Sequence, residues 1–258
     1  MRRASWLVLA FAYIFIYLPV AVLVLFSFQE SRVPVPPFDG PTFDWYVKIL
    51  GDRRVLEAAG NSLLVGVLSS LVATSAGFLA ASGFARHRIL GGRLLETVIV
   101  VPITVSYLVI GLGLLITLNA LGFSKSLFGV GIGHVVINLP LCFMIALSQL
   151  GPAEARLEAA ARDLGAREWQ VMARITLPLS APGLFAAFFL AFTLSWDEFV
   201  IAFLLTSFDI TLPVVIWSKL RTGLNPETNA IGALVFLVSL VTATLVEFAI
   251  SRRRGSRA

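Results

Sequence analysis

Six long apolar segments constrain this chain more than any other feature of its sequence. Each segment runs for about 20 residues or more, the length that an α-helix needs to cross the hydrocarbon core of a bilayer. The segments are approximately residues 6–28, 59–85, 93–119, 127–149, 181–206 and 229–250. Their apolar residues are continuous rather than alternating, which excludes membrane-spanning β-strands. The sequence therefore predicts an all-α polytopic membrane protein with six transmembrane helices in a single domain over residues 1–258.

The composition favours lipid as the solvent for much of the surface. Hydrophobic residues make up 58% of the 258 residues, and only 14% are charged, against about 25% in soluble domains. The net charge of +5 is compatible with nucleic-acid binding. However, the basic residues stand in short clusters between the apolar segments, where membrane topology places them. We therefore expect the lipid bilayer, and no nucleic acid, as a partner.

The distribution of lysine and arginine predicts the orientation, because the side richer in these residues is cytoplasmic. Thirteen of the 20 basic residues fall on one side. They are Arg2, Arg3, Arg86, Arg88, Arg93, Arg156, Arg162, Arg167, Arg174, Arg252, Arg253, Arg254 and Arg257. Both termini are then cytoplasmic, and residues 29–58 lie outside. The first apolar segment is longer than the apolar region of a signal peptide and no A-x-A site follows it, so we expect it to remain as the first span.

A polar segment separates the fourth and fifth spans. Residues 153–174 are rich in helix-forming and charged residues, and Gly165 divides them into two helical pieces. The apolar residues fall on one helical stripe, formed by Leu157, Ala161, Leu164, Val171 and Ile175. An amphipathic pair of helices on the cytoplasmic face fits two interpretations: it lies on the lipid surface, or it binds a cytosolic protein. An anionic leaflet would repel its four acids, which favours the protein: Glu154, Glu158, Asp163 and Glu168.

The same segment resembles the EAA motif of ABC importer permeases. The matching residues are Glu158-Ala159-Ala160, Gly165 and Ile175-x-Leu177-Pro178. Family members usually place the glutamate six residues before the glycine, and that position is Ala159 here. The resemblance implies that residues 153–174 form a coupling helix that docks on a cytosolic ATPase. The coupling residues would be Glu158, Ala159, Ala160, Asp163, Gly165, Ile175, Leu177 and Pro178.

Within this family the chain is most similar to the spermidine/putrescine permease group. The resemblance is carried by Trp45-Tyr46, Asn61-Ser62-Leu63, "ARDLGA" at 161–166, "FTLSWDEFVIAF" at 192–203 and "TLPVVIWSKLRTGLNPETNA" at 211–230. It implies a polyamine importer of the bacterial inner (cytoplasmic) membrane. The implied partners are a second permease subunit, two cytosolic ABC ATPase subunits and an external substrate-binding protein.

Two adjacent acids lie at membrane depth. Asp197 and Glu198 fall within the fifth apolar segment, where a charged residue costs at least about 2.5 kcal/mol. Carboxylates and aromatic rings are natural ligands for a polycation, so a substrate path would use Trp196, Asp197 and Glu198. Pro102 and Tyr107 in the third segment would either line a kink in this path or form a plain helix kink, and the plain kink is favoured. An equal alternative is that the acids form a structural ion pair or a gate.

Other functional classes find less support in the sequence. No G-x-x-x-x-G-K-[ST] phosphate loop occurs, so we expect no ATP hydrolysis by this chain itself. An intramembrane enzyme would have to use Asp197 and Glu198, whose side chains diverge if they are neighbours on one helix. A permease for another small substrate stays open, whereas a secondary transporter would show inverted repeats, and none is evident. A single cysteine, Cys142, and two distant histidines, His87 and His134, predict no metal site and no cofactor.

Overall fold

The computed structural model describes residues 2–223 and 225–255, which are helical in their regular parts. Among these residues there is no strand, only an isolated bridge between Gln29 and Pro41. Arg257, which was counted for the orientation, and Leu224 of the 211–230 motif lie outside the described residues. The helices are α1 (Arg2–Phe26), α2 (Asp44–Gly51), α3 (Arg53–Arg86), α4 (Gly92–Val100), η1 (Val101–Thr104), α5 (Tyr107–Ala120), α6 (Leu127–Ser148), α7 (Pro152–Asp163), α8 (Glu168–Val171), η2 (Met172–Thr176), α9 (Leu177–Trp196), α10 (Val200–Leu205), α11 (Leu212–Thr222) and α12 (Pro226–Gly255).

The predicted all-α membrane architecture is confirmed. Among the described residues, five helices are long and apolar enough to cross a membrane. A sixth span results if α4 with η1 and α5, which are bent by 110° at their junction, count as one. The third segment was predicted as one helix over 93–119. It is instead broken at Val105 and Ser106, because Pro102 supports only a 3-10 turn and Ser106 caps a new helix through the backbone N–H of Leu108.

The chain divides into two compact units. The first comprises residues 1–59 and 212–241. In it, Asn225 accepts a hydrogen bond from the backbone N–H of Glu227 at 2.9 Å. Asn225 therefore caps the start of α12, which explains part of the "NPETNA" pattern as a helix-start signal. The buried Glu227 also accepts hydrogen bonds from Lys48 of α2 at 2.6 Å and from Lys219 of α11 at 2.5 Å, so it ties three helices together.

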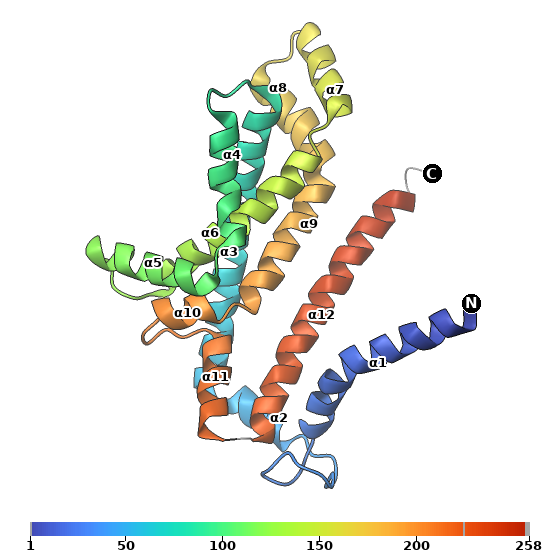
Figure 1. The fold of residues 1–258 in the computed structure, drawn as a ribbon, viewed down its shortest axis with the longest axis vertical. Coiled ribbons are helices and arrows are strands. Elements are labelled where there is room, and N and C mark those ends of the chain that lie inside the picture. Colours follow the sequence, from blue (N-terminus) through green and yellow to red (C-terminus); the bar gives the residue numbers. More distant parts are fainter. Residues whose placement is uncertain (1, 224, 256–258) are drawn as a thin grey trace. The chain divides into compact units, whose positions relative to one another are not determined.

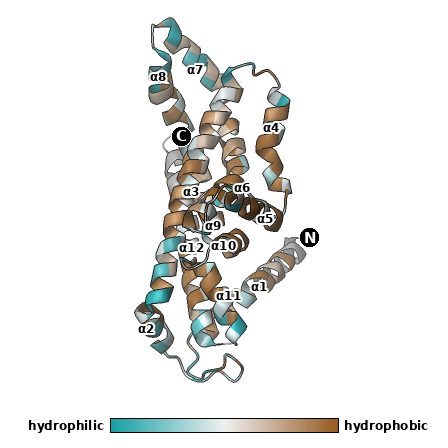
Figure 2. Ribbon diagram, turned by 90° about the vertical axis from the view of Figure 1, so that its left-hand side faces the viewer, coloured by the Kyte–Doolittle hydropathy of each residue, from teal (hydrophilic) through white to brown (hydrophobic). Residues whose placement is uncertain are grey.

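The second unit comprises residues 60–211 and 242–258, and it holds both candidate sites. In it α6 packs along α9 and α3, and the backbones approach closely. A Cβ at Gly77 would come within 2.8 Å of the backbone nitrogen of Phe143, so only glycine fits this crossing. Figure 1 shows α7 and α8 at the end of the unit where α3 turns into α4. Figure 2 shows hydrophilic residues on α7, beside the largely hydrophobic helices that it adjoins.

The fifth predicted span, 181–206, differs from the structure at both ends. α8, η2 and α9 form one 29-residue helix from Glu168 to Trp196, about 43 Å long at 1.5 Å per residue. This length exceeds the roughly 30 Å hydrocarbon core, so part of the helix extends beyond the lipid. At the other end, α9 stops at Trp196, and the short α10 begins only at Val200.

Candidate functional site

Residues 153–174, called the coupling segment here after their predicted role, form a bent pair of helices as predicted from Gly165. α7 ends at Asp163, and Gly165 adopts a left-handed backbone conformation with φ +86°. Side chains with a Cβ rarely adopt this conformation, which is the physical reason for glycine at the turn. After the turn, α8 begins at Glu168 and continues into the fifth span. The second arm of the segment is therefore the first part of a membrane-spanning helix rather than a separate piece.

The outer face of the coupling segment exposes large apolar side chains. Leu157 is 53% exposed, Leu164 is 90% exposed and Trp169 is 59% exposed. Ala159, Ala160, Asp163 and Gly165 are exposed as well. The predicted apolar stripe does not face one way, because Val171 is buried while Leu157 and Leu164 point outward. An exposed apolar group with charged residues around it is typical of a protein-binding surface.

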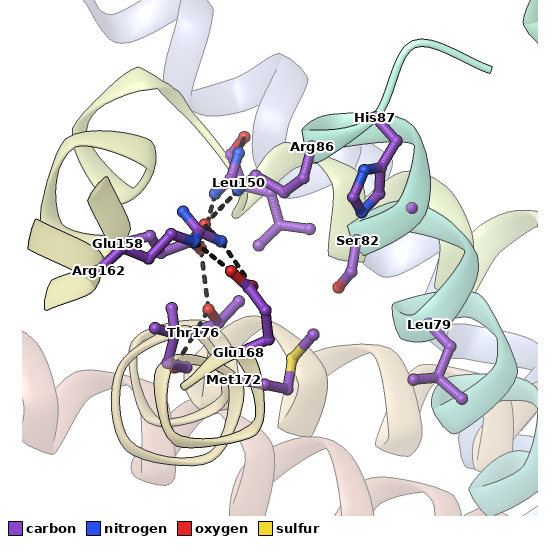
Figure 3. Close-up of a pocket in the computed structure, with 12 residues that line it drawn as sticks. Leu79, Ser82, Arg86, His87, Leu150, Glu158, Arg162, Glu168, Met172 and Thr176 are labelled. Carbon is purple, nitrogen blue, oxygen red and sulfur yellow. Dashed lines mark hydrogen bonds and ion pairs between the residues drawn. The ribbon is translucent and has the colours of Figure 1, made fainter. Parts of the chain in front are cut away.

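Glu158, unlike its neighbours, is buried, with 1% of its surface exposed. Its carboxylate accepts two hydrogen bonds from the Arg86 guanidinium, at 2.6 Å from Nε and 3.0 Å from Nη2. It also accepts one from the Thr176 hydroxyl at 2.8 Å. Figure 3 shows these side chains converging beside a cavity of about 170 Å³. Glu158 was predicted as an ATPase-coupling residue, but its side chain faces the interior of this protein, toward α3 and η2.

The contacts of Glu158 determine its charge. Burial by itself raises the pKa of the Glu158 carboxyl, but the hydrogen bonds from Arg86 and Thr176 and the charges of Arg86 and Arg162 outweigh burial and hold this pKa below its ordinary value. Arg162 reaches Glu158 at 3.8 Å and donates two hydrogen bonds to Glu168, at 2.7 and 3.0 Å. The ion pair between Arg162 and Glu168 joins α7 to α8 across the Gly165 turn.

The last three predicted coupling residues lie where the segment meets the fifth span. Ile175 is half-buried in η2, a single π-helical turn, and Leu177 and Pro178 are exposed in the first turn of α9. The backbone N–H of Leu177 donates to the carbonyl of Met172, five residues earlier. Pro178 cannot donate a backbone hydrogen bond, and the wider π turn before it makes room for its ring.

The second candidate site is the break after α9. Asp197 and Glu198 were predicted inside a continuous helix, but Asp197 is the C-terminal cap of α9 and Glu198 lies between α9 and α10. The Glu198 carboxylate accepts hydrogen bonds from the backbone N–H groups of Ile201, at 3.0 Å, and Ala202, at 3.2 Å. It therefore satisfies backbone donors at the start of α10, which a break within the membrane must do.

A chain of buried side chains holds Glu198 in place. Nε2 of His134, on α6, lies 3.3 Å from the Glu198 carboxylate, and Nδ1 contacts the Ser195 hydroxyl. Ser69 of α3 reaches the same hydroxyl at 3.1 Å. Because the carboxylate accepts, Nε2 carries the proton, and in the neutral ring Nδ1 accepts from Ser195. Sequence reasoning missed His134, since it had been considered only as a metal ligand; a lone histidine within an apolar span was the available signal.

The other predicted path residues have different surroundings. Asp197 is exposed, whereas Trp196 is 6% exposed and stacks on Phe192 with ring centroids 6.2 Å apart. Tyr107, at the start of α5, is 38% exposed. Among the described residues, no hydrogen bond or ring contact joins Tyr107 to the Trp196–Glu198 group. The described residues also hold no group of three or more side chains suited to a metal.

Comparison with known proteins gives a consistent result. Residues 73–255 match the family model described as "binding-protein-dependent transport system inner membrane component". The chain is 32% identical over 241 residues to the spermidine/putrescine transport system permease protein PotC of Escherichia coli (strain K12), covering 93% of this chain and 90% of PotC. It is 31% identical over 243 residues to the putrescine transport system permease protein PotI of the same strain, covering 90% and 86%.

A solved structure shares the fold. It is the bacterial alginate ABC transporter in complex with an alginate pentasaccharide-bound periplasmic protein. The matching chain has a TM-score of 0.70 and 19% identity, and the match covers 97% of this chain and 93% of that one. The resemblance inferred from residues 153–178 and 192–230 is therefore confirmed, and this chain belongs to the family of inner membrane components of binding-protein-dependent transport systems.

Proposed function

We propose that this chain is a permease subunit of an ATP-driven importer for polyamines. The observation that carries the proposal is the likeness over nine-tenths of the chain to permeases named for spermidine and putrescine. The chain would form half of the translocation path together with a second permease subunit. Two cytosolic ABC ATPase subunits would hydrolyse ATP, and an external binding protein would deliver the substrate.

The coupling segment is the proposed docking site for an ATPase subunit. Its exposed Leu157, Leu164 and Trp169 offer the apolar and aromatic surface that protein interfaces favour. Asp163 and the small residues Ala159 and Ala160 lie on the same exposed segment and leave room for close approach. Glu158 supports this surface from behind rather than contacting the partner.

Asp197 is the proposed contact for a cationic substrate. It is exposed at the end of α9, and none of its side-chain contacts within the described residues neutralises its charge. Discontinuous helices at membrane depth commonly bring polar groups to a substrate path. A carboxylate there attracts a polycation and repels an anion, which agrees with a polyamine cargo.

The coupling proposal is tested by Gly165→Arg in the complete transporter, purified with its ATPase and reconstituted into liposomes. The arginine is strained at φ +86° and places a long side chain on the docking surface. We expect the permease subunits to assemble while the ATPase subunits are lost on co-purification or hydrolyse ATP without transport. Full retention of the ATPase together with normal uptake would contradict the docking assignment.

The substrate proposal needs a separate measurement. Unlabelled putrescine should inhibit the uptake of radiolabelled spermidine, and an anion of similar size should not. If the transporter assembles and its ATPase is stimulated by its binding protein, but no polyamine enters, the importer class stands and the cargo is another small molecule.

A further inference from the structure

Arg86 joins four elements at the end of the second unit where the coupling segment lies. It is the last residue of α3, and its guanidinium binds Glu158 of α7 through two nitrogens, at 2.6 and 3.0 Å. Its third nitrogen, Nη1, donates to the carbonyl of Leu150, just after α6, at 3.3 Å. Through Glu158 it also reaches Thr176 in η2, at the start of the fifth span. The four contacting residues, Arg86, Leu150, Glu158 and Thr176, all belong to the same compact unit.

The ion pair of Arg86 and Glu158, here called the joint, holds the two side chains in a fixed relative orientation. Both nitrogens of one side of the guanidinium face both carboxylate oxygens, an arrangement that fixes orientation as well as distance. The side chains of Arg86 and Glu158 are 15% and 2% exposed, so water competes little for these hydrogen bonds. Below them Phe78, Phe143 and Leu150 form a buried apolar cluster, against which Met172 of η2 also packs.

The joint connects the proposed docking segment with α3, a helix that also contacts the break after α9. The coupling segment contains α7, whereas α3 carries Ser69, which belongs to the hydrogen-bond chain that holds Glu198. The π turn of η2 is the one irregular turn within the long helix from Glu168 to Trp196 among the described residues. Such turns often accompany functional sites, and Thr176 of this turn is bound to the same carboxylate.

We propose that Arg86 is a positioning residue for coupling: its ion pair with Glu158 clamps the coupling segment to α3 and η2 and transmits the movement of the segment to these helices. The inference rests on the proposed function, because it assumes that an ATPase moves the segment. It assigns Glu158 a role within the permease, which agrees with its burial and with its position one residue before the usual site of the family glutamate.

The test uses the whole transporter, with its ATPase and binding protein, in liposomes. Arg86→Gln and Glu158→Gln each remove one charge and keep a polar side chain. We expect both variants to retain the co-purified ATPase, because the exposed docking surface is unchanged. Spermidine uptake per ATP hydrolysed should fall at least tenfold. The exchanged pair Arg86→Glu/Glu158→Arg should recover at least a third of the wild-type ratio, as expected for a direct interaction.

Arg88→Gln is the matched control, since Arg88 is an exposed arginine two residues after Arg86. This variant should leave the ratio of spermidine uptake to ATP hydrolysis unchanged. A merely stabilising pair would lower the yield of transporter and reduce uptake and ATP hydrolysis together, with the ratio intact. An unchanged ratio with a lower yield would overturn the proposal. So would loss of the ATPase from either single variant. The proposal would also fail if the exchanged pair transports no more spermidine per ATP than the single variants.

Failure of the proposed function gives a different pattern. A wild-type chain that binds no ATPase would refute the importer assignment before any variant is compared. A wild-type complex whose ATPase responds to its binding protein without spermidine uptake would refute only the polyamine cargo. In that case the readout for the joint is the stimulation of ATP hydrolysis by the binding protein. Arg86→Gln should abolish this stimulation, and Arg88→Gln should retain it.

Discussion

Asp197 and Glu198 are neighbours in the chain, yet their side chains have different surroundings. Glu198 is 6% exposed and accepts hydrogen bonds from Ile201, Ala202 and His134, so its charge is used within the protein. Asp197 is exposed at the helix end. The two interpretations that the sequence left open, cation path and structural pair, therefore apply to different residues: we assign the first to Asp197 and the second to Glu198.

This division predicts different defects for two variants that each remove one charge. Asp197→Asn keeps the shape of the side chain, so it should assemble normally and lower polyamine uptake roughly tenfold, or about 1.4 kcal/mol. Glu198→Gln removes the negative charge and replaces one acceptor oxygen with an NH2 group, so weaker acceptors remain for the N–H groups of Ile201 and Ala202 and for His134. Hydrogen bonds to a charged group contribute about 1.5–3 kcal/mol, against about 0.5–1.5 kcal/mol between neutral groups, so this variant should unfold at a lower temperature.

The measurements are radiolabelled spermidine uptake in liposomes and thermal unfolding of the purified complex. Asp209→Asn serves as the control, because Asp209 is an exposed acid beyond α10; it should alter neither result. If Asp197→Asn transports normally, Asp197 does not contact the cation. If Glu198→Gln is as stable as the wild type, the hydrogen bonds to the start of α10 contribute nothing.

The helical elements show which parts of the fold hydropathy can predict. Five apolar segments overlap long helices, because a lipid-facing helix must be apolar over most of its length. The turn at Gly165 was also predictable, since glycine is the residue that favours its conformation. The break after Trp196 was not, because residues 197–199 contain neither glycine nor proline. It depends on the Glu198 side chain and on His134, 64 residues away in the chain.

The candidate site shows the same limit. The sequence correctly indicated two bent helices at 153–174, but it could not tell which side of α7 faces the permease. That choice depends on Arg86, 72 residues earlier. One departure from the family pattern, the glutamate at Glu158 rather than at Ala159, was the signal that this side chain has an internal partner.

For α7 the ion pair predicts a specific dependence of stability on pH. The pKa of Glu158 is lowered in the folded protein, so the carboxylate stabilises the fold above its unfolded pKa, and this contribution is lost as the pH falls through the folded pKa. The contribution should therefore be constant between pH 6 and 8 and decline only below the ordinary glutamate value of 4.5. Removing one partner of a buried ion pair lowers the free energy of unfolding by about 3 kcal/mol.

The check compares thermal unfolding of the wild type and of Glu158→Gln in detergent from pH 4 to 8. The wild type should be more stable by a constant margin at neutral pH, and the margin should shrink at the acidic end. A margin that changes between pH 6 and 7 would mean that a group other than this carboxylate controls the attachment of α7.

At the scale of the whole molecule, the orientation in the membrane decides which sites face which compartment. The contact between Arg86 and Glu158 places the turn after α3 and the coupling segment at one end of the second unit. The arginine distribution predicts both of these as cytoplasmic. Because segments that touch outside the bilayer lie on the same side of it, this contact agrees with the part of the prediction that puts both segments in one compartment.

The orientation itself is tested by reporter fusions, and the charge asymmetry of 13 basic residues to 7 sets the expected result. Alkaline phosphatase is active only outside the cytoplasm, because its disulfides form there. A fusion after Ala258 should therefore be inactive, and an insertion near Asp39, in the loop after α1, should be active. A fluorescent protein that matures in the cytoplasm, fused after Ala258, should give the opposite signal and confirm that the fusion is expressed.

If the phosphatase is active after Ala258 and inactive near Asp39, the coupling segment faces away from the cytosol. No cytosolic ATPase could then reach Leu157, Leu164 or Trp169, and the coupling proposal would fail together with the topology.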